Sequence, residues 1–145
     1  MASQARSIQD EVFMAIKAPS SNDEIKCEML FRCPLCHPTV IMRKTLFNKY
    51  RLRYNPLFLK SEDYELWSRA VEFFPIHNVR DILLSYRAHN NQASKTDVIR
   101  QKEFEENIFQ VQLNKLNINP TPEELELHYI AGVSRTVENK IQLRQ

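Results

Sequence analysis

The sequence has 145 residues and is 43% apolar, which is enough for one compact domain with a buried core. Its net charge of +2 provides no strong overall field that would favour nucleic acid or a membrane surface, and no apolar run is long enough to span a bilayer. A single glycine, Gly132, excludes a glycine-rich phosphate loop.

The N-terminus lacks the apolar segment of a secretory signal. The three cysteines are an odd number and are typical of reduced thiols in a cytosolic protein. We therefore expect a cytoplasmic protein, with peripheral contact with a membrane left open.

Two helices are predicted at the start of the chain. Residues 7–17 carry apolar side chains at helical spacing and predict a short amphipathic helix. Ser21 and Glu24 form a capping-box pattern, which predicts a second helix from Asp23 to about Arg32.

The next segment is irregular, because Pro34 and Pro38 bracket it. Residues 39–42, Thr-Val-Ile-Met, are typical of a short buried strand. Residues 43–47 predict the start of a helical turn.

A helix over residues 62–74, with Ser61 as its N-cap, places one acid on its apolar side. At roughly 100° per residue, Glu62 falls on the polar face and Asp63 in the middle of the apolar face. The apolar face holds Leu66, Trp67, Ala70, Val71 and Phe74, and the polar face holds Glu65, Arg69 and Glu72. Asp63 has two interpretations. It can be a first-turn acid that interacts favourably with the helix dipole, or a general base at a loop-to-helix junction.

After an extended segment, residues 82–87 predict a second strand, and residues 88–94 form a polar loop. A long helix is expected over 95–116, with two apolar stripes, one of which is a candidate subunit interface. Thr121 as N-cap, Pro122 as first residue and Glu124 as capping glutamate begin another helix. A final helix over about 134–143 is expected after Gly132.

Two local patterns have competing interpretations. Cys33 to His37 matches the Cys-x-x-Cys-His pattern of haem attachment, and with Cys27 it suggests zinc, but buried thiols are favoured over both. The segment 43–53 is basic, has no acid and is interleaved with aromatic residues. It suits a phosphate backbone or an anionic membrane surface, although a solvated face is favoured.

Taken together, three segments resemble a known family. They are His-Pro-Thr-Val-Ile-Met-Arg-Lys at 37–44, Ser-Glu-Asp-Tyr-Glu-Leu-Trp-Ser-Arg at 61–69, and a third segment that runs from Asn-Val at 78–79 through Leu-Leu-Ser-Tyr-Arg-Ala-His at 83–89 and closes on Gln-Ala-Ser at 92–94. In this order, over about residues 22–95, they resemble the C-terminal half of family 2 glycosyltransferases. These are inverting GT-A enzymes, many of which build bacterial surface polysaccharides. The region ending in Leu127-His128 is similar to their tail.

The resemblance implies roles for individual residues. Asp63 corresponds to the catalytic base, which deprotonates the acceptor hydroxyl as the nucleotide diphosphate leaves the donor sugar. Substrate binding is implied for Glu62, His37, Arg43, Arg87 and His89, and His89 is also a candidate metal ligand. The implied partners are a nucleotide sugar and a saccharide or lipid-linked acceptor, and the implied cofactor of the complete enzyme is manganese or magnesium.

The sequence also departs from that family, because it has no Asp-x-Asp metal motif and no N-terminal nucleotide-binding half. We therefore expect a partial GT-A fold, α+β and mostly helical, without the Rossmann-like half. The expected parts are an N-terminal helix and linker (1–21), the subdomain with the catalytic base (22–95) and a helical extension (96–145). The alternative is a non-catalytic domain for acceptor binding or for homo-oligomerisation through the 95–116 helix.

Overall fold

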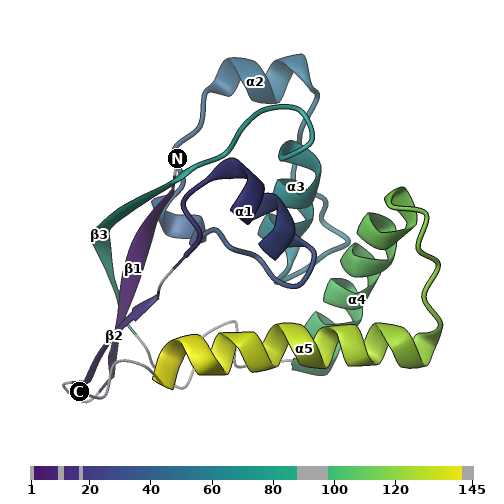
Figure 1. Cartoon of the computed structure of the whole chain (residues 1–145). Helices are drawn as coiled ribbons and strands as arrows, with labels where there is room; N and C mark the ends of the chain where they lie inside the picture. Colours follow the sequence, from purple (N-terminus) through teal and green to yellow (C-terminus); the bar gives the residue numbers. More distant parts are fainter. Residues whose placement is uncertain (1, 10–11, 17, 88–97, 142–145) are drawn as a thin grey trace.

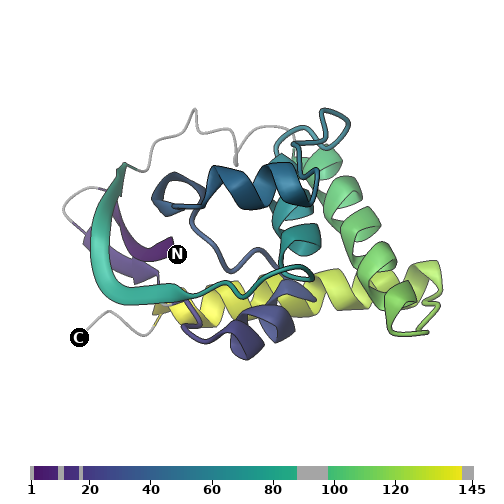
Figure 2. The same ribbon diagram turned by 90° about the horizontal axis from the view of Figure 1, so that it is seen from above.

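A computed structural model describes residues 2–9, 12–16, 18–87 and 98–141. A small sheet lies at one end of the molecule and helix α4 at the other, with α5 running along the molecule between them (Figures 1 and 2). The fold is α+β and mostly helical, as predicted. Its elements are β1 Ala2–Gln9, β2 Val12–Ile16, α1 Asn22–Met29, the 3-10 helix η1 His37–Thr39, α2 Lys44–Lys49, α3 Glu62–Ala70, β3 Asn78–Arg87, α4 Val98–Lys115 and α5 Pro122–Ile141.

The sheet has the strand order β2-β1-β3. Strand β1 pairs antiparallel with β2, with Ile8 opposite Phe13, and parallel with β3, with Ser7 opposite Tyr86. The helix predicted over 7–17 is therefore wrong. An isolated helix of this length is marginal in water, whereas β-branched and aromatic residues suit strands that can pair with a neighbour. This pairing places β1 and β2 in the same sheet as β3.

Helix α1 begins as predicted, because Ser21 and Glu24 form a complete capping box. The Ser21 hydroxyl accepts a hydrogen bond from the Glu24 amide at 3.3 Å, and the Glu24 carboxylate accepts one from the Ser21 amide at 3.1 Å. The helix ends at Met29, a few residues earlier than expected. Ile25 and Met29 face the core and are fully buried.

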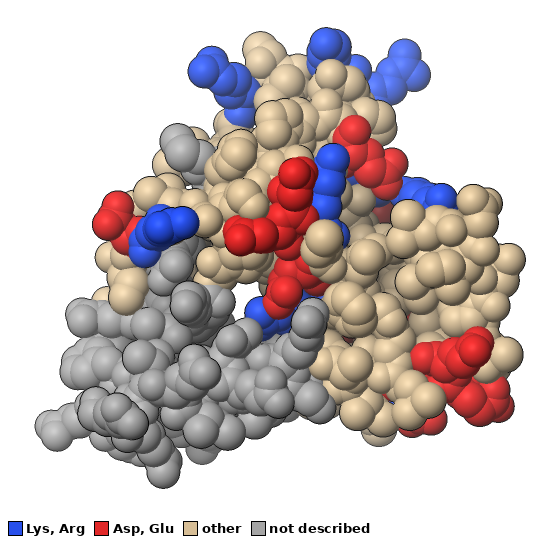
Figure 3. All heavy atoms as spheres, in the orientation of Figure 1, with Lys and Arg blue, Asp and Glu red and all other residues tan. Residues whose placement is uncertain are grey.

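The strand predicted over 39–42 is not formed. Thr39 ends η1, and residues 40–42 lie outside the sheet of the described residues, with Ile41 77% exposed. Pro38 suits the first turn of η1, and a short apolar run does not by itself distinguish a strand from other structures. The helical turn predicted from Arg43 is confirmed as α2, and Lys and Arg side chains gather over it (Figure 3).

Helix α3 has the predicted apolar face, since Leu66, Trp67 and Ala70 are each at most 2% exposed, but it ends at Ala70 and not at residue 74 as predicted. They join the core formed by α1 and the middle of α4, where Ile108 and Phe109 are buried. Trp67 is therefore a core residue, as expected. Ser61 occupies the N-cap position, but its hydroxyl makes no cap hydrogen bond and has no partner in the described part of the chain.

Most side chains of the two apolar stripes predicted on the 95–116 helix pack against other parts of the same chain. Ile108, Phe109 and Leu113 are buried, whereas Val111 and Leu116 remain about half exposed. Self-association through this helix stays a prediction. No helix in the described part of the chain is long and apolar enough to cross a membrane.

Helix α5 starts with the predicted capping box, since the Thr121 hydroxyl accepts from the Glu124 amide at 3.3 Å. The separate final helix expected after Gly132 is wrong, because α5 continues through this glycine to Ile141. Gly132 does not break the helix; it allows a close crossing. A Cβ atom there would overlap with the carbonyl oxygen of Phe31, just beyond the end of α1.

Substituting Gly132 tests this crossing. In an unconstrained helix, Gly→Ala stabilises by about 1 kcal/mol. Because the added methyl group meets backbone that cannot move aside cheaply, we expect Gly132→Ala to lower the free energy of unfolding by about 1–3 kcal/mol in urea titrations. Val133→Ala, at an exposed neighbouring position, should change it by less than about 0.5 kcal/mol. A more stable Gly132→Ala protein would contradict the crossing.

Candidate functional site

Asp63 lies in the first turn of α3 and bridges two elements. Its Oδ2 atom is 3.3 Å from Nδ1 of His37, and its Oδ1 atom accepts a hydrogen bond from the Tyr64 amide at 2.8 Å. The Asp63 side chain is 26% exposed, so it is neither buried nor freely solvated. A carboxylate held in this way keeps a defined direction while a small molecule can still approach it.

His37 in turn contacts Tyr54. The Tyr54 hydroxyl is 3.3 Å from Nε2 of His37, and the two rings stack with a centroid distance of 5.9 Å and an angle of 3°. A neutral imidazole with its proton on Nδ1 satisfies both contacts, because it donates to Asp63 and accepts from the tyrosine. The three side chains form the row Tyr54–His37–Asp63.

The loop that carries His37 is anchored on both sides. Leu35 is buried in the core, and the Thr39 hydroxyl donates to the Cys36 carbonyl at 2.8 Å. The side-chain amide of Asn78, at the start of β3, donates to the Pro34 carbonyl at 3.1 Å. The imidazole therefore projects from a restrained loop toward the first turn of α3.

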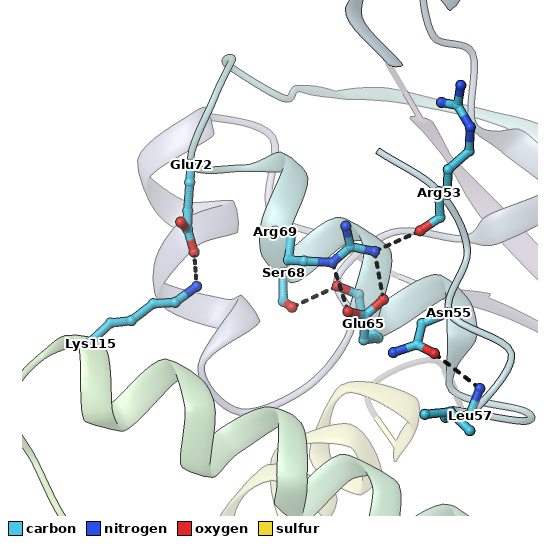
Figure 4. A network of polar contacts seen from close by, with 8 residues as sticks. All are labelled: Arg53, Asn55, Leu57, Glu65, Ser68, Arg69, Glu72 and Lys115. Carbon is cyan, nitrogen blue, oxygen red and sulfur yellow. Dashed lines mark hydrogen bonds and ion pairs between the residues drawn. The ribbon is translucent and has the colours of Figure 1, made fainter. Parts of the chain in front are cut away.

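A polar network on the outer face of α3 holds the segment that carries Tyr54 (Figure 4). The Arg69 guanidinium binds both carboxylate oxygens of Glu65, at 2.7 and 2.8 Å, and also donates to the Arg53 carbonyl at 2.7 Å. The Arg53 side chain extends away from this network (Figure 4). The bond to Arg69 thus fastens the backbone next to Tyr54 to the helix that carries Asp63.

The negative charge of Asp63 influences several neighbours. Burial raises the pKa of the Cys36 thiol, and the Asp63 charge raises it further. The pKa of Tyr54 is raised by burial and then by Asp63 and Glu62. On α4, burial raises the pKa of the Glu105 carboxyl, and Asp63 adds to this effect although a hydrogen bond from Gln101 opposes it. Sequence periodicity gave no sign that Glu105 lies near the site.

The other predicted site residues lie in different surroundings, and not all of them are described. Glu62 was assigned to the polar face of its helix, yet its Oε2 atom is buried and has no hydrogen-bond partner in the described part of the chain. Arg43 lines an apolar pocket of about 380 Å³ beside Trp67. Arg87 ends β3, where the structure describes only its backbone, and His89 lies outside the described residues.

The described residues do not fit a metal ion. No group of three or more His, Cys, Asp or Glu side chains within them is arranged to hold one. His37, the histidine of the Cys-x-x-Cys-His pattern, is engaged by Asp63 and Tyr54. Burial raises the pKa of the Cys33 thiol far above its usual range. Cys33 and Cys36 are partly buried, whereas Cys27 is exposed, so the prediction of buried thiols is wrong for Cys27.

Comparison with curated proteins finds two relatives. A Haemophilus influenzae protein named uncharacterized glycosyltransferase is 31% identical over 107 residues, which is 71% of this chain and 33% of that protein. The bifunctional glycosyltransferase pgtA of Dictyostelium discoideum is 30% identical over 112 residues, which is 74% of this chain and 14% of that protein. The chain is similar to part of two glycosyltransferases.

The chain spans about a third of the length of the bacterial relative and much less of the other. No family model matches the sequence, and no solved structure matches it. The relatives therefore support a likeness to glycosyltransferases in general, and finer assignments depend on the site itself.

The proximity of Asp63 to the thiols can be tested by alkylation. Because a negative charge disfavours a thiolate, removing it lowers the pKa of Cys36 and increases the thiolate fraction at a given pH. We expect Asp63→Asn to speed the reaction of Cys36 with iodoacetamide severalfold at pH 8, as measured by peptide mass spectrometry. Glu72→Gln, at an exposed acid on the same chain segment, should leave the rate unchanged. An equal rate in Asp63→Asn would contradict this proximity.

Proposed function

We propose that this chain carries the acceptor side of an inverting family 2 glycosyltransferase. The reaction is transfer of a sugar from a nucleotide-diphospho-sugar to a hydroxyl of a saccharide or lipid-linked acceptor. Two observations support the proposal: the likeness of about 70% of the chain to proteins named glycosyltransferases, and an oriented, partly exposed carboxylate at Asp63. The position of the Asp63 carboxylate is the observation on which the proposed roles of the individual residues depend.

In the proposed step, Asp63 acts as the general base. Its Oδ2 atom accepts the proton of the acceptor hydroxyl while the oxygen attacks the anomeric carbon of the donor sugar. The bond from that carbon to the diphosphate oxygen breaks, and its electron pair leaves with the nucleoside diphosphate. Attack in line with the departing group inverts the anomeric centre.

His37 is proposed as a positioning residue for this base. Its Nδ1 atom lies 3.3 Å from Asp63 Oδ2. A neutral imidazole there orients the carboxylate without neutralising it, as histidine and carboxylate pairs do in other sites. The oxygen that accepts the proton is therefore the one that His37 contacts.

Glu62 is proposed to bind a substrate hydroxyl. A buried carboxylate oxygen without a hydrogen bond is costly, and a sugar hydroxyl would satisfy it. Arg43, Arg87 and His89 remain proposed substrate-binding residues through the family resemblance. A divalent ion is implied by the same resemblance, but because the described residues do not fit one, no step of this proposal runs through a metal.

Replacing Asp63 tests the general base. Asn keeps the shape and polarity of the side chain but cannot take up the proton, so we expect Asp63→Asn to lower kcat by about 10²–10⁴-fold. The measurement is nucleoside diphosphate release by this chain with manganese, a panel of sugar nucleotides and candidate acceptors. Glu72→Gln should retain full turnover.

The result also separates catalysis from binding alone. If the unmodified chain turns over and Asp63→Asn turns over equally fast, Asp63 is not the base. If the chain binds acceptor saccharides but releases no nucleoside diphosphate from any donor, it acts by itself as an acceptor-binding domain, and the general-base role of Asp63 in this chain alone is wrong.

A further inference from the structure

A second pocket shares Met42 in its lining with the apolar pocket beside Trp67. It has a volume of about 450 Å³, within the range of small-molecule sites. Its lining combines apolar and aromatic surface with polar side chains, contributed by Met42, Lys44, Phe47, Asn48, Arg53 and Tyr54. The lining surface is mostly apolar and a few polar side chains contribute to it, as in sites that bind an amphipathic small molecule.

The charged side chains that line this pocket are both positive. Lys44 and Arg53 are exposed, and neither has a carboxylate partner among the described residues. From residue 43 to residue 60 the sequence has no acid. Lys and Arg side chains stand at this end of the molecule, over α2 (Figure 3). The pocket thus offers two cationic side chains to a ligand, while the carboxylates of Asp63 and Glu62 act on its Tyr54 side.

Arg53 is already held in place. Its guanidinium donates to the Leu52 carbonyl at 2.6 Å and to the Asn48 side-chain oxygen at 3.3 Å. Its backbone is fastened on the opposite side by Arg69. Because the side chain is ordered before any ligand arrives, binding an anion costs less conformational entropy there than at a free arginine.

Tyr54 connects this pocket to the candidate base. It is 45% exposed and lines the pocket, while its hydroxyl contacts His37, which in turn contacts Asp63. A molecule in the pocket that packs on the Tyr54 ring therefore lies next to the row Tyr54–His37–Asp63. Sugar rings have apolar faces that pack on aromatic rings, and their hydroxyls project from the rim.

We propose that this pocket is an acceptor subsite for an anionic saccharide. The sugar ring packs against Tyr54 and Phe47, and its phosphate or carboxylate is held by Lys44 and Arg53. This inference rests on the proposed function, since it identifies the acceptor as a negatively charged sugar, but its test is a binding measurement that requires no turnover.

Trp67 provides the measurement. It is the single tryptophan of the sequence and lies edge-on to Phe47 and His37, at centroid distances of 6.5 and 6.3 Å. Its fluorescence is titrated with glucose 1-phosphate, glucuronate, glucose and inorganic phosphate. We expect both charged sugars to bind at least about tenfold more tightly than glucose or phosphate alone. Their affinity should fall as salt is raised, because the charges involved are near the surface.

Variants assign the binding to the pocket. Lys44→Gln and Arg53→Gln should each weaken glucose 1-phosphate by about tenfold, and Tyr54→Ala by a similar factor. Lys49→Gln is the matched control, because Lys49 is an exposed cation of the same helix that does not line the pocket. Circular dichroism establishes that each variant remains folded.

The outcomes separate this inference from the proposed function. Equal affinity for glucose and glucose 1-phosphate, inorganic phosphate binding as tightly as the charged sugars, or equal weakening by Lys49→Gln and Lys44→Gln would each overturn the subsite. A chain that shows the expected binding pattern without sugar transfer keeps the subsite and loses the catalytic role. If sugar transfer depends on Asp63 but the Lys44 variant keeps its affinity for glucose 1-phosphate, the catalytic role stands and the subsite is wrong.

Discussion

The end of α1 is the constraint on which the rest of the structure depends. The Met29 carbonyl accepts hydrogen bonds from the Tyr64 hydroxyl of α3 at 2.5 Å and from the Gln112 amide of α4 at 3.0 Å. The next carbonyl, of Leu30, is 2.5 Å from Nε2 of His128 on α5. The last carbonyls of a helix have no partner within it, and here the other long helices provide those partners. Helices α3, α4 and α5 are thereby brought together at one point.

This junction also places the candidate site, because the chain leaves α1 directly into the loop that carries His37. Tyr64, which binds the Met29 carbonyl, directly follows Asp63. The base and the junction therefore occupy neighbouring positions in the same turn of α3. The third member of the row, Tyr54, is brought in separately, through the hydrogen bond from Arg69 to the Arg53 carbonyl. Buried contacts thus support one side of the site and a surface network supports the other.

Local signals in the sequence predicted much of this arrangement, because they act over a few residues. The capping boxes at Ser21 and Thr121 and the apolar face of α3 are examples. The predictions were wrong where contacts between segments far apart in the sequence determine the local structure. Strand β1 pairs with β3, and β2 pairs with β1, so both depend on a segment far along the chain. Gly132 is needed within α5 because the backbone of Phe31 crosses there. For the site, the motif around Asp63 suggested a base, but only the fold shows its contact with His37 and the approach of Tyr54.

The junction at α1 also affects the order in which the molecule assembles. Its hydrogen bonds join residues that are 35, 83 and 98 positions apart in the sequence. Closing such long loops costs entropy before any contact compensates for it, so contacts of this kind form slowly. During synthesis, α1 emerges long before His128 and cannot have all its terminal carbonyls satisfied until α5 has left the ribosome. The hydrogen bonds at the end of α1, from which the His37 loop departs, are therefore completed only after α5 has formed.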